Sequence, residues 1–353
     1  MLDNGKFRPV KKKKELKYRT AKELIAADLP PTEYIVDVII AKGLVVLSAK
    51  SKIGKSWLAL QLALAVASGD NFLGFNTTQG DVLYIDLENT ESIAQSRLTI
   101  LLNGEEPPDN LVIVNDYSTM NDTFLADLTE YLETHRKVSL VIVDVYQKIK
   151  KAKRANQSDY DDAYENLTPL KELAGKYNIA LMLIMHNRKM IDPSDEFSDV
   201  LGSTAIMGVS DEMLVIRKKE RKSPDATLSI TGRTVRGGGY TIQFNEPLCK
   251  WEMIGDAEEI QERKNREEYN NAPIVRAVKR LVATNGGSYT GTISEIISAS
   301  KYLKNCRIYQ SPQKTGRDLA KYSKKLREYD GIIHAQASNG NASGKHTFSK
   351  ATV

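Results

Sequence analysis

Apolar and polar positions divide the chain into short apolar runs and longer amphipathic stretches that alternate with them. Five runs have the length of a buried strand: residues 43–48, 81–88, 110–114, 138–144 and 179–185. Stretches that favour helix stand between them: residues 57–68, 91–102, 122–135 and a segment with Tyr164, Leu167, Leu170 and Leu173 at helical spacing. Pro169 lies inside the last of these and predicts a kinked or broken helix. Strands that alternate with helices predict an α/β fold with a mostly parallel sheet.

The pattern changes after the fifth run. Residues 187–200 are polar and form a stretch long enough for a functional loop. Short β segments follow at residues 211–217, 226–233 and 240–244, with turn residues between them. We expect them to extend the sheet with antiparallel strands. Together with the alternating part, they define one predicted domain over residues 29–254.

Both flanks of this domain are rich in charge. Residues 1–28 are predicted to form a basic arm, in which Lys11–Lys14 is a run of lysines, and then a short helix that Thr20 and Glu23 cap. The lysine run is either a solvated tail or an electrostatic arm for nucleic acid. Residues 255–272 are predicted to be a charged, solvated linker helix.

The last predicted domain covers residues 273–353. Helices are expected at residues 274–284, 292–299 and 314–329, followed by two strands that flank the turn signal at 339–341. Three helices and a hairpin, in this order, predict a small winged-helix-like α+β module. Its third helix is strongly basic and carries Lys314, Arg317, Lys321, Lys324, Lys325 and Arg327. Such a helix suits a DNA groove, and the alternative is a solvated helix in a protein-contact module.

The first predicted strand is followed by a candidate phosphate-binding loop. Residues 49–56 read A-K-S-K-I-G-K-S, one substitution away from the pattern G-x-x-x-x-G-K-[ST]. The candidate nucleotide-binding residues are Ala49, Lys50, Ser51, Lys52, Ile53, Gly54, Lys55 and Ser56, together with Asp144. Backbone N–H groups and the helix N-terminus would surround phosphate, with Lys55 on the β- and γ-phosphates and Ser56 on Mg²⁺. A chance Gly-Lys-Ser that opens a helix is the alternative.

Two predicted strands end in acid, where parallel sheets bind their ligands. Asp144 ends the fourth strand and is the expected Walker B acid, which reaches Mg²⁺ through water. Its alternative is an ordinary helix cap. Glu88 ends the second strand and is the favoured base for the attacking water, with Asp86 as its competitor on the same face.

Basic side chains follow the later strands. His186 ends the fifth strand, where an imidazole could hydrogen-bond the γ-phosphate or a water, or serve only the structure. Arg188 and Lys189 follow it and could contact phosphate or nucleic acid. Arg233 ends a late strand, with Arg236 close behind, and could reach a neighbouring subunit's nucleotide or remain a surface arginine.

Composition adds few constraints. The chain has 353 residues and a net charge of +5, which permits nucleic-acid binding without requiring it. Its two cysteines, Cys249 and Cys306, fit neither a disulfide framework nor a zinc site, so we expect a cytoplasmic protein. No apolar run approaches the ~20 residues of a membrane span, and no membrane partner is expected.

The order of these motifs resembles the RepA-like ATPases, RecA-fold hexameric replicative helicases of plasmids, phages and integrated elements. The resemblance is carried by L-S-A-K-S-K-I-G-K-S-W-L-A-L-Q-L-A at 47–63, V-A-S-G-D-N-F-L-G at 66–74, G-D-V-L-Y-I-D-L-E at 80–88, V-I-V-D at 141–144, I-M-H-N-R-K at 184–189 and G-S-T-A-I-M-G-V-S-D at 202–211. It covers about two thirds of the chain and fades after Trp251.

The resemblance implies a RecA-like P-loop ATPase that uses ATP and Mg²⁺. It implies Glu88 as the catalytic glutamate, Asp144 as the Walker B acid and His186 as a sensor, and it places Arg233 where the family has its trans-acting arginine. It further implies a ring, expected to be a hexamer, that binds single-stranded DNA and works with a primase or initiator. The family often has paired histidines where this chain has Met185-His186, and Ala49 replaces the usual glycine.

The sequence therefore predicts an ATP-driven DNA translocase, a ring-forming replicative helicase of a mobile element. Residues 187–200 would face its channel, and the terminal module would bind duplex DNA or a replication partner. The alternative is an ATP-dependent DNA-binding or loading factor that does not unwind.

Overall fold

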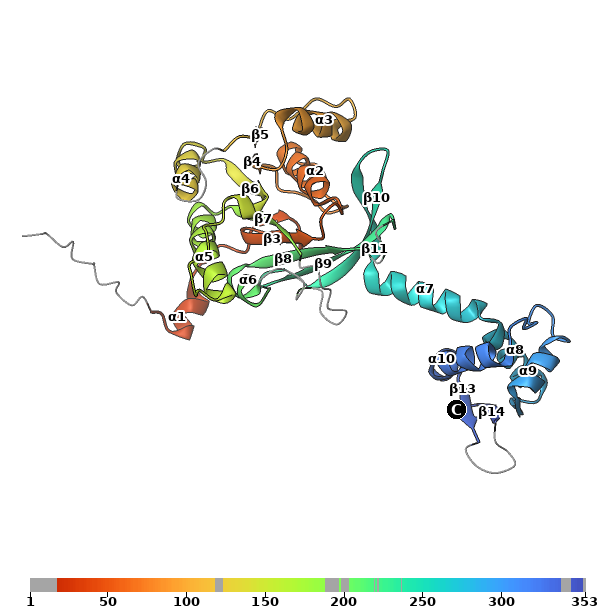
Figure 1. Ribbon diagram of the computed structural model, residues 1–353. Coiled ribbons are helices and arrows are strands. Elements are labelled where there is room, and N and C mark those ends of the chain that lie inside the picture. Colours follow the sequence, from red (N-terminus) through yellow and green to blue (C-terminus); the bar gives the residue numbers. More distant parts are fainter. Residues whose placement is uncertain are drawn as a thin grey trace, which may run out of the picture.

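The computed structural model describes residues 18–117, 123–187, 197, 203–218, 220, 222–235, 237–337 and 344–351. These residues form a large α/β body and a small module, joined by a helix that leads away from the sheet (Figure 1). The large body has two hydrophobic cores, and the small module has a third of its own. Within the described residues, no helix is both long and apolar enough to cross a membrane.

A nine-stranded sheet forms the centre of the large body, in the order β11-β10-β9-β8-β3-β7-β6-β4-β5. Its parallel strands are β3 (Gly43–Ala49), β4 (Asp81–Asp86), β5 (Leu111–Val114), β6 (Val138–Asp144), β7 (Ala180–His186) and β8 (Glu212–Arg217). Antiparallel strands β9 (Asp225–Gly232), β10 (Gly238–Asn245) and β11 (Lys250–Asp256) complete it. The five predicted parallel strands are confirmed.

The antiparallel extension was predicted only partly correctly. The first of its segments, β8, pairs parallel with β3, and the sheet reverses direction only at β9. The helix α6 (Ser203–Val209) precedes β8 and was not predicted. It packs on α5 and returns the chain to the sheet's amino edge, so β8 runs in the direction of β3.

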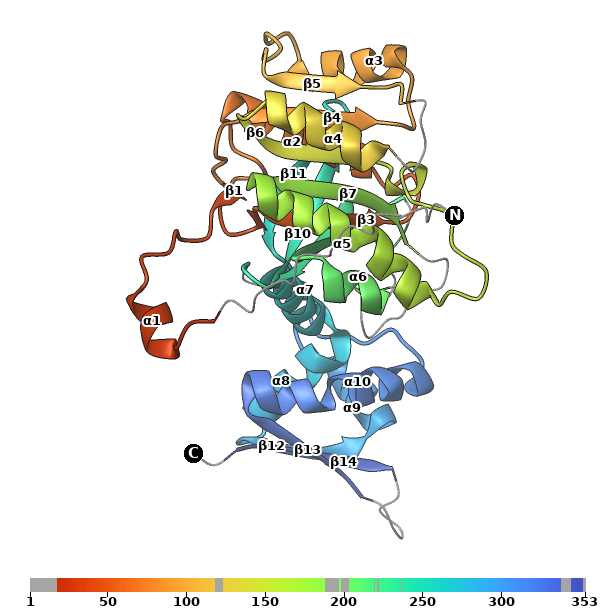
Figure 2. The same cartoon turned by 90° about the vertical axis from the view of Figure 1, so that its left-hand side faces the viewer.

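Helices cover both faces of the sheet. The helices α2 (Lys55–Ser68) and α3 (Glu91–Leu102) lie on one face, and α4 (Phe124–Thr134), α5 (Asp159–Tyr177) and α6 lie on the other (Figure 1 and Figure 2). Two hydrophobic cores result, one on each face of the sheet. Burial on both faces explains why the central strands are continuous apolar runs in the sequence.

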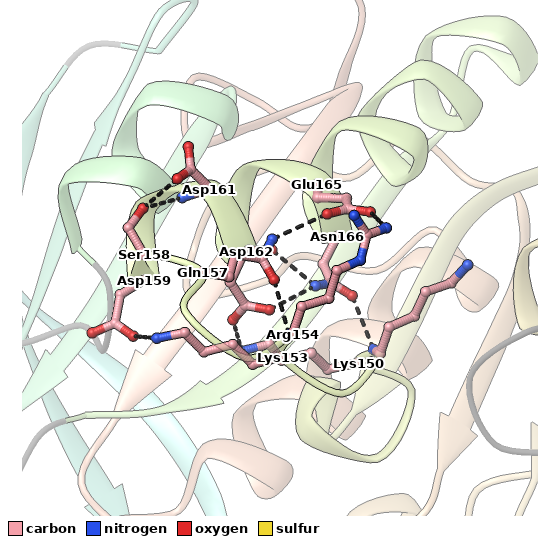
Figure 3. A network of polar contacts seen from close by, with 11 residues as sticks. Lys150, Lys153, Arg154, Gln157, Ser158, Asp159, Asp161, Asp162, Glu165 and Asn166 are labelled. Carbon is pink, nitrogen blue, oxygen red and sulfur yellow. Dashed lines mark hydrogen bonds and ion pairs between the residues drawn. The ribbon is translucent and has the colours of Figure 1, made fainter.

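Pro169 does not break its helix, because α5 runs without interruption from Asp159 to Tyr177. The segment before α5 is fastened to its first turns by a polar network (Figure 3). Arg154 pairs with Glu165 at 2.6 Å, and Lys150 pairs with Asp162. The short 3₁₀ helix η1 (Tyr146–Lys148) leads from β6 into this segment, so the network holds the chain just after Asp144.

The N-terminal part carries the predicted capped helix. The helix α1 (Ala21–Ala26) has both hydrogen bonds of the capping box between Thr20 and Glu23. A two-stranded hairpin, β1 (Tyr34–Val36) with β2 (Ile40–Ala41), then leads into β3. The run Lys11–Lys14 lies outside the described residues.

The linker helix α7 (Ala257–Asn271) begins at the end of β11, where the Asp256 side chain caps it. It is less solvated than predicted, because Ile260 packs against Gly255 and Tyr269 is fully buried in the core of the small module.

The small module contains α8 (Pro273–Thr284), β12 (Ser288–Thr292), α9 (Ile293–Ser300), α10 (Pro312–Asp330), β13 (Ile332–Gln336) and β14 (Lys345–Lys350). Its helices pack on one face of a sheet with the order β12-β14-β13 (Figure 2). The strand β12 was not predicted, because its sequence is polar. The expected turn at 339–341 lies outside the described residues.

Candidate active site

The candidate phosphate-binding loop connects β3 to α2 at the carboxyl edge of the parallel strands. Ala49 is the last residue of β3 and pairs with His186 on one side and Ile216 on the other. It is therefore extended, and alanine at this position costs nothing relative to glycine. The left-handed conformations lie further along the loop, at Lys52 with φ +63° and at Gly54 with φ +106°.

Gly54 is required by packing as well as by its backbone angle. A Cβ at this position would lie 3.2 Å from the ring of Trp251, which is 1% exposed. The Trp251 indole Nε1 donates to the Gly54 carbonyl at 3.1 Å, and its backbone exchanges two hydrogen bonds with the Gln61 side chain in α2. Trp251 thus positions both the loop and the helix that follows it. Sequence analysis missed this residue.

Lys55 lies at the first turn of α2 with its ammonium turned back toward the loop. Its Nζ donates to the Ala49 carbonyl at 2.8 Å and lies 3.0 Å from His186 Nδ1. Burial lowers the pKa of Lys55 to about 8, although Asp144 and Glu88 act in the opposite direction. The ammonium is therefore poorly solvated, and a polyanionic phosphate would stabilise its charge.

Asp144 lies at the end of β6, beside the start of α2. The carboxylate accepts hydrogen bonds from the Ser56 hydroxyl and, at 3.1 Å, from the Tyr84 hydroxyl. Burial raises the pKa of Asp144, and these two hydroxyls counter the rise. Ser56 and Asp144 offer the hard oxygen ligands that Mg²⁺ prefers. The described residues contain no cluster of three or more metal-ligating side chains, so the remaining ligands would be phosphate and water oxygens.

The structure separates the two candidate bases. Asp86 is 3% exposed, and its carboxylate accepts from the Asn89 amide at 2.9 and 3.0 Å and from backbone N–H groups of the turn. The Glu88 side chain is 41% exposed, and its Oε1 lies 3.5 Å from His186 Nε2. Glu88 is thus the carboxylate that an incoming water can reach, whereas the Asp86 carboxylate is buried and hydrogen-bonded within the turn that follows β4.

His186 connects these parts, because its two ring nitrogens face opposite partners. Nδ1 faces the Lys55 ammonium and Nε2 faces Glu88. The next residue, Asn187, hydrogen-bonds the Ala49 carbonyl through its backbone and receives the Ser48 hydroxyl on its side chain. The end of β7 is therefore held against the loop, and Lys55, His186 and Glu88 form a continuous polar row.

A profile described as an AAA domain matches residues 12–191 of the chain. The match covers just over half of the 353 residues. The chain belongs to this family. It is an ATPase of the AAA-domain class, and its core has the predicted α/β architecture with a mostly parallel sheet.

Solved structures similar to this AAA domain include one described as an "ATPase Domain", at 16% identity and a TM-score of 0.48, over 60% of this chain and 84% of that one. Another is "The Structure Of A DnaB-Like Replicative Helicase And Its Interactions With Primase", at 16% identity and a TM-score of 0.49. That match covers 65% of this chain and 64% of the other, slightly less than two thirds of its length. A search of curated proteins finds no match.

In this AAA domain protein, the Arg233 side chain lies far from the phosphate-binding loop of the same chain. Because β9 is antiparallel, Gly232 pairs with Glu212 near the amino edge of the sheet, four residues along β8 from the partner of Ala49. The Arg233 guanidinium donates to the Gly208 carbonyl at 2.7 Å and lies 3.8 Å from Asp211. It is not brought together with the other candidates within one chain.

The remaining candidates lie outside the described residues. These are Arg188, Lys189 and Arg236, together with most of the segment 187–200 that was expected to face a channel, of which only residues 187 and 197 are described.

Proposed function

We propose that this ATPase is an ATP-driven DNA translocase, a ring-forming replicative DNA helicase of a mobile element. The observation that supports it most is the polar row of Lys55, His186 and Glu88, which joins the phosphate-binding loop to the end of β7. The chain continues from there into the segment 187–200. A residue that senses phosphate is thus one position away from the segment proposed to grip single-stranded DNA.

The residues of the loop take distinct roles in this proposal. The N–H groups around Lys50 to Gly54 and the start of α2 cradle the phosphates, and Lys55 moves its ammonium from the loop carbonyls to the β- and γ-phosphates. Ser56 directly, and Asp144 through water, would hold Mg²⁺, which would neutralise developing charge on the phosphates. Glu88 accepts the proton of the attacking water. His186 contacts the γ-phosphate and thereby couples its presence to the position of β7.

The position of Arg233 supports the proposal of a ring. Because the guanidinium lies far from the loop of its own chain, its proposed target is the nucleotide of a neighbouring subunit. We therefore propose a homo-oligomeric ring, a hexamer, in which Arg233 acts in trans. The contacts of Arg233 with Gly208 and Asp211 would have to open for this.

The small module is proposed to be a winged-helix-like domain over residues 273–353. Its α10 presents Lys314 and Arg317 at exposed or half-exposed positions, whereas Lys321 pairs with Glu268 and Lys324 with Glu328. We propose duplex DNA as its partner, with a primase or an initiator as a further partner of the ring, in the cytoplasm.

The test is ATP hydrolysis by the full chain with and without single-stranded DNA, followed by strand displacement. Glu88→Gln is the catalytic variant and Asp86→Asn its matched partner. Stimulation by DNA that Glu88→Gln abolishes, with strand displacement by wild type, supports the helicase. DNA-stimulated hydrolysis without strand displacement identifies a loading factor, and hydrolysis indifferent to DNA refutes both. Activity that survives in Glu88→Gln assigns the base to Asp86.

A further inference from the structure

Two tyrosines of the small module are almost completely exposed. Tyr302 is 89% and Tyr309 81% accessible, and both lie in the connection between α9 and α10. Tyrosine has on average an intermediate burial, because its ring has a large apolar area, so rings exposed to more than 80% stand out. Two such rings within eight residues of one loop are therefore a feature that the fold of the module does not require.

The loop that carries them is firmly anchored. Cys306 and Ile308 are 7% and 3% exposed and belong to the core of the module, and the Ile308 N–H donates to the Ser300 hydroxyl at 3.0 Å. Buried and exposed residues alternate from Cys306 to Tyr309. Because the buried members fix the backbone, Tyr309 cannot turn inward, and the loop presents its ring to solvent.

All charged residues of the segment that carries the two rings are basic. The segment 301–317 contains no Asp or Glu, and its cationic residues are Lys301, Lys304, Arg307, Lys314 and Arg317. The Arg307 guanidinium carbon lies 4.9 Å from the centre of the Tyr309 ring, which is a cation–π distance. Exposed aromatic rings in a segment whose charged residues are all cationic match a nucleic-acid strand that offers both phosphates and unstacked bases.

We propose that residues 301–311 bind unpaired nucleic-acid bases, which stack on Tyr302 and Tyr309 while the surrounding cations hold the phosphates. The ligand is single-stranded DNA. Stacking needs unpaired bases, so the preference is for a single strand over a blunt duplex. The proposal rests on the nucleic-acid function of this protein but assigns to the small module a ligand other than the duplex proposed for α10.

The experiment compares full-length variants by fluorescence anisotropy without nucleotide, on an oligothymidine and on a blunt duplex of equal length. Tyr302→Ala/Tyr309→Ala removes the rings, and Tyr302→Phe/Tyr309→Phe keeps them. Tyr160→Ala/Tyr164→Ala is the matched control, since that pair is half exposed on α5 and stacks at 6.2 Å. Cross-linking to 5-iodouracil oligonucleotides, with peptide mapping, locates the contact.

We expect the alanine pair to lose single-strand affinity at least about tenfold, the range of one stacked base, with duplex affinity nearly unchanged. The phenylalanine pair and the α5 control should bind like wild type, and the cross-link should map to 302–309. Unchanged single-strand binding by the alanine pair refutes this proposal and leaves the proposed function intact, as does an equal loss on both ligands. A changed oligomeric state without changed DNA binding identifies a protein interface instead. If wild type binds no nucleic acid and its ATPase ignores DNA, the proposed function itself fails.

Discussion

The buried Lys55 ammonium makes ATP affinity depend on pH in a range where the nucleotide itself hardly titrates. Burial lowers the pKa of Lys55 to about 8 in the free protein. Only the ammonium form pairs with phosphate, and the bound phosphates raise the pKa again because opposite charges favour the ionised form. Binding therefore takes up a proton above pH 8. We expect affinity to fall as pH rises.

The magnitude follows from the protonated fraction of the free protein. With a pKa of about 8, about nine tenths of Lys55 is charged at pH 7 and about one tenth at pH 9. The dissociation constant should thus rise about tenfold between these pH values, which is ~1.4 kcal/mol. Near pH 8, binding should take up about half a proton.

The assay is titration of a fluorescent, non-hydrolysable ATP analogue at saturating Mg²⁺ from pH 7 to pH 9. Calorimetry in two buffers of different ionisation enthalpy measures the proton uptake. Lys55→Arg is the control, since a guanidinium stays charged throughout this range and its profile should be flat. A wild-type profile as flat as that of Lys55→Arg would refute the reasoning, because it would mean that Asp144 and Glu88 outweigh the burial of Lys55.

Three further variants test other parts of the structure. Trp251→Phe loses the hydrogen bond to the Gly54 carbonyl and leaves a cavity, so chemical denaturation should show a loss of about 1–3 kcal/mol, and ATP should bind more weakly. Burial raises the pKa of Glu212 to about 7. The contribution of this carboxyl to the free energy of unfolding is therefore complete below about pH 4.5 and is lost as pH rises through 7. Glu212→Gln should stabilise the fold by up to about 3 kcal/mol at pH 8 and hardly at all at pH 4.5. Equal gains at both pH values would contradict this. Arg233→Ala should bind ATP without hydrolysing it, and mixing it with Glu88→Gln should restore activity if the arginine acts in trans; a mixture without activity argues for a role within the subunit.

The strands of the sheet could be predicted because burial on both faces leaves a continuous apolar run in the sequence. The strand β6 was predicted to the residue as Val138–Asp144. The strand β12 was missed because Ser288–Thr292 is polar, and it is held mainly by its pairing with β14. The direction of β8 could not be predicted, because an apolar run carries no information on which way it crosses the sheet.

The candidate site could be predicted as far as local motifs determine it. The loop, Lys55 and the acids at the strand ends follow from spacing alone. The different environments of Asp86 and Glu88 were also accessible in principle, because Asn89 lies three residues after Asp86 and such a pair readily forms a side-chain-bonded turn. Trp251 left no such signal. It lies 197 residues from Gly54, and only the tertiary packing of the edge strand β11 against α2 brings the two together.

The hydrogen bond between the Trp251 indole and the Gly54 carbonyl connects the phosphate-binding loop to the small module through β11 and α7. Trp251 is the second residue of β11, β11 ends at Asp256, and Asp256 caps α7. The helix α7 in turn places Tyr269 in the core of the small module. Any movement of Gly54 when phosphate is bound or released must either break the indole hydrogen bond or shift β11. The indole also packs against the Phe244 ring, and the Trp251 backbone is bonded to the Gln61 side chain in α2, so a shift of the strand requires fewer contacts to be lost. The small module is therefore expected to change its position when phosphate binds to the loop or leaves it.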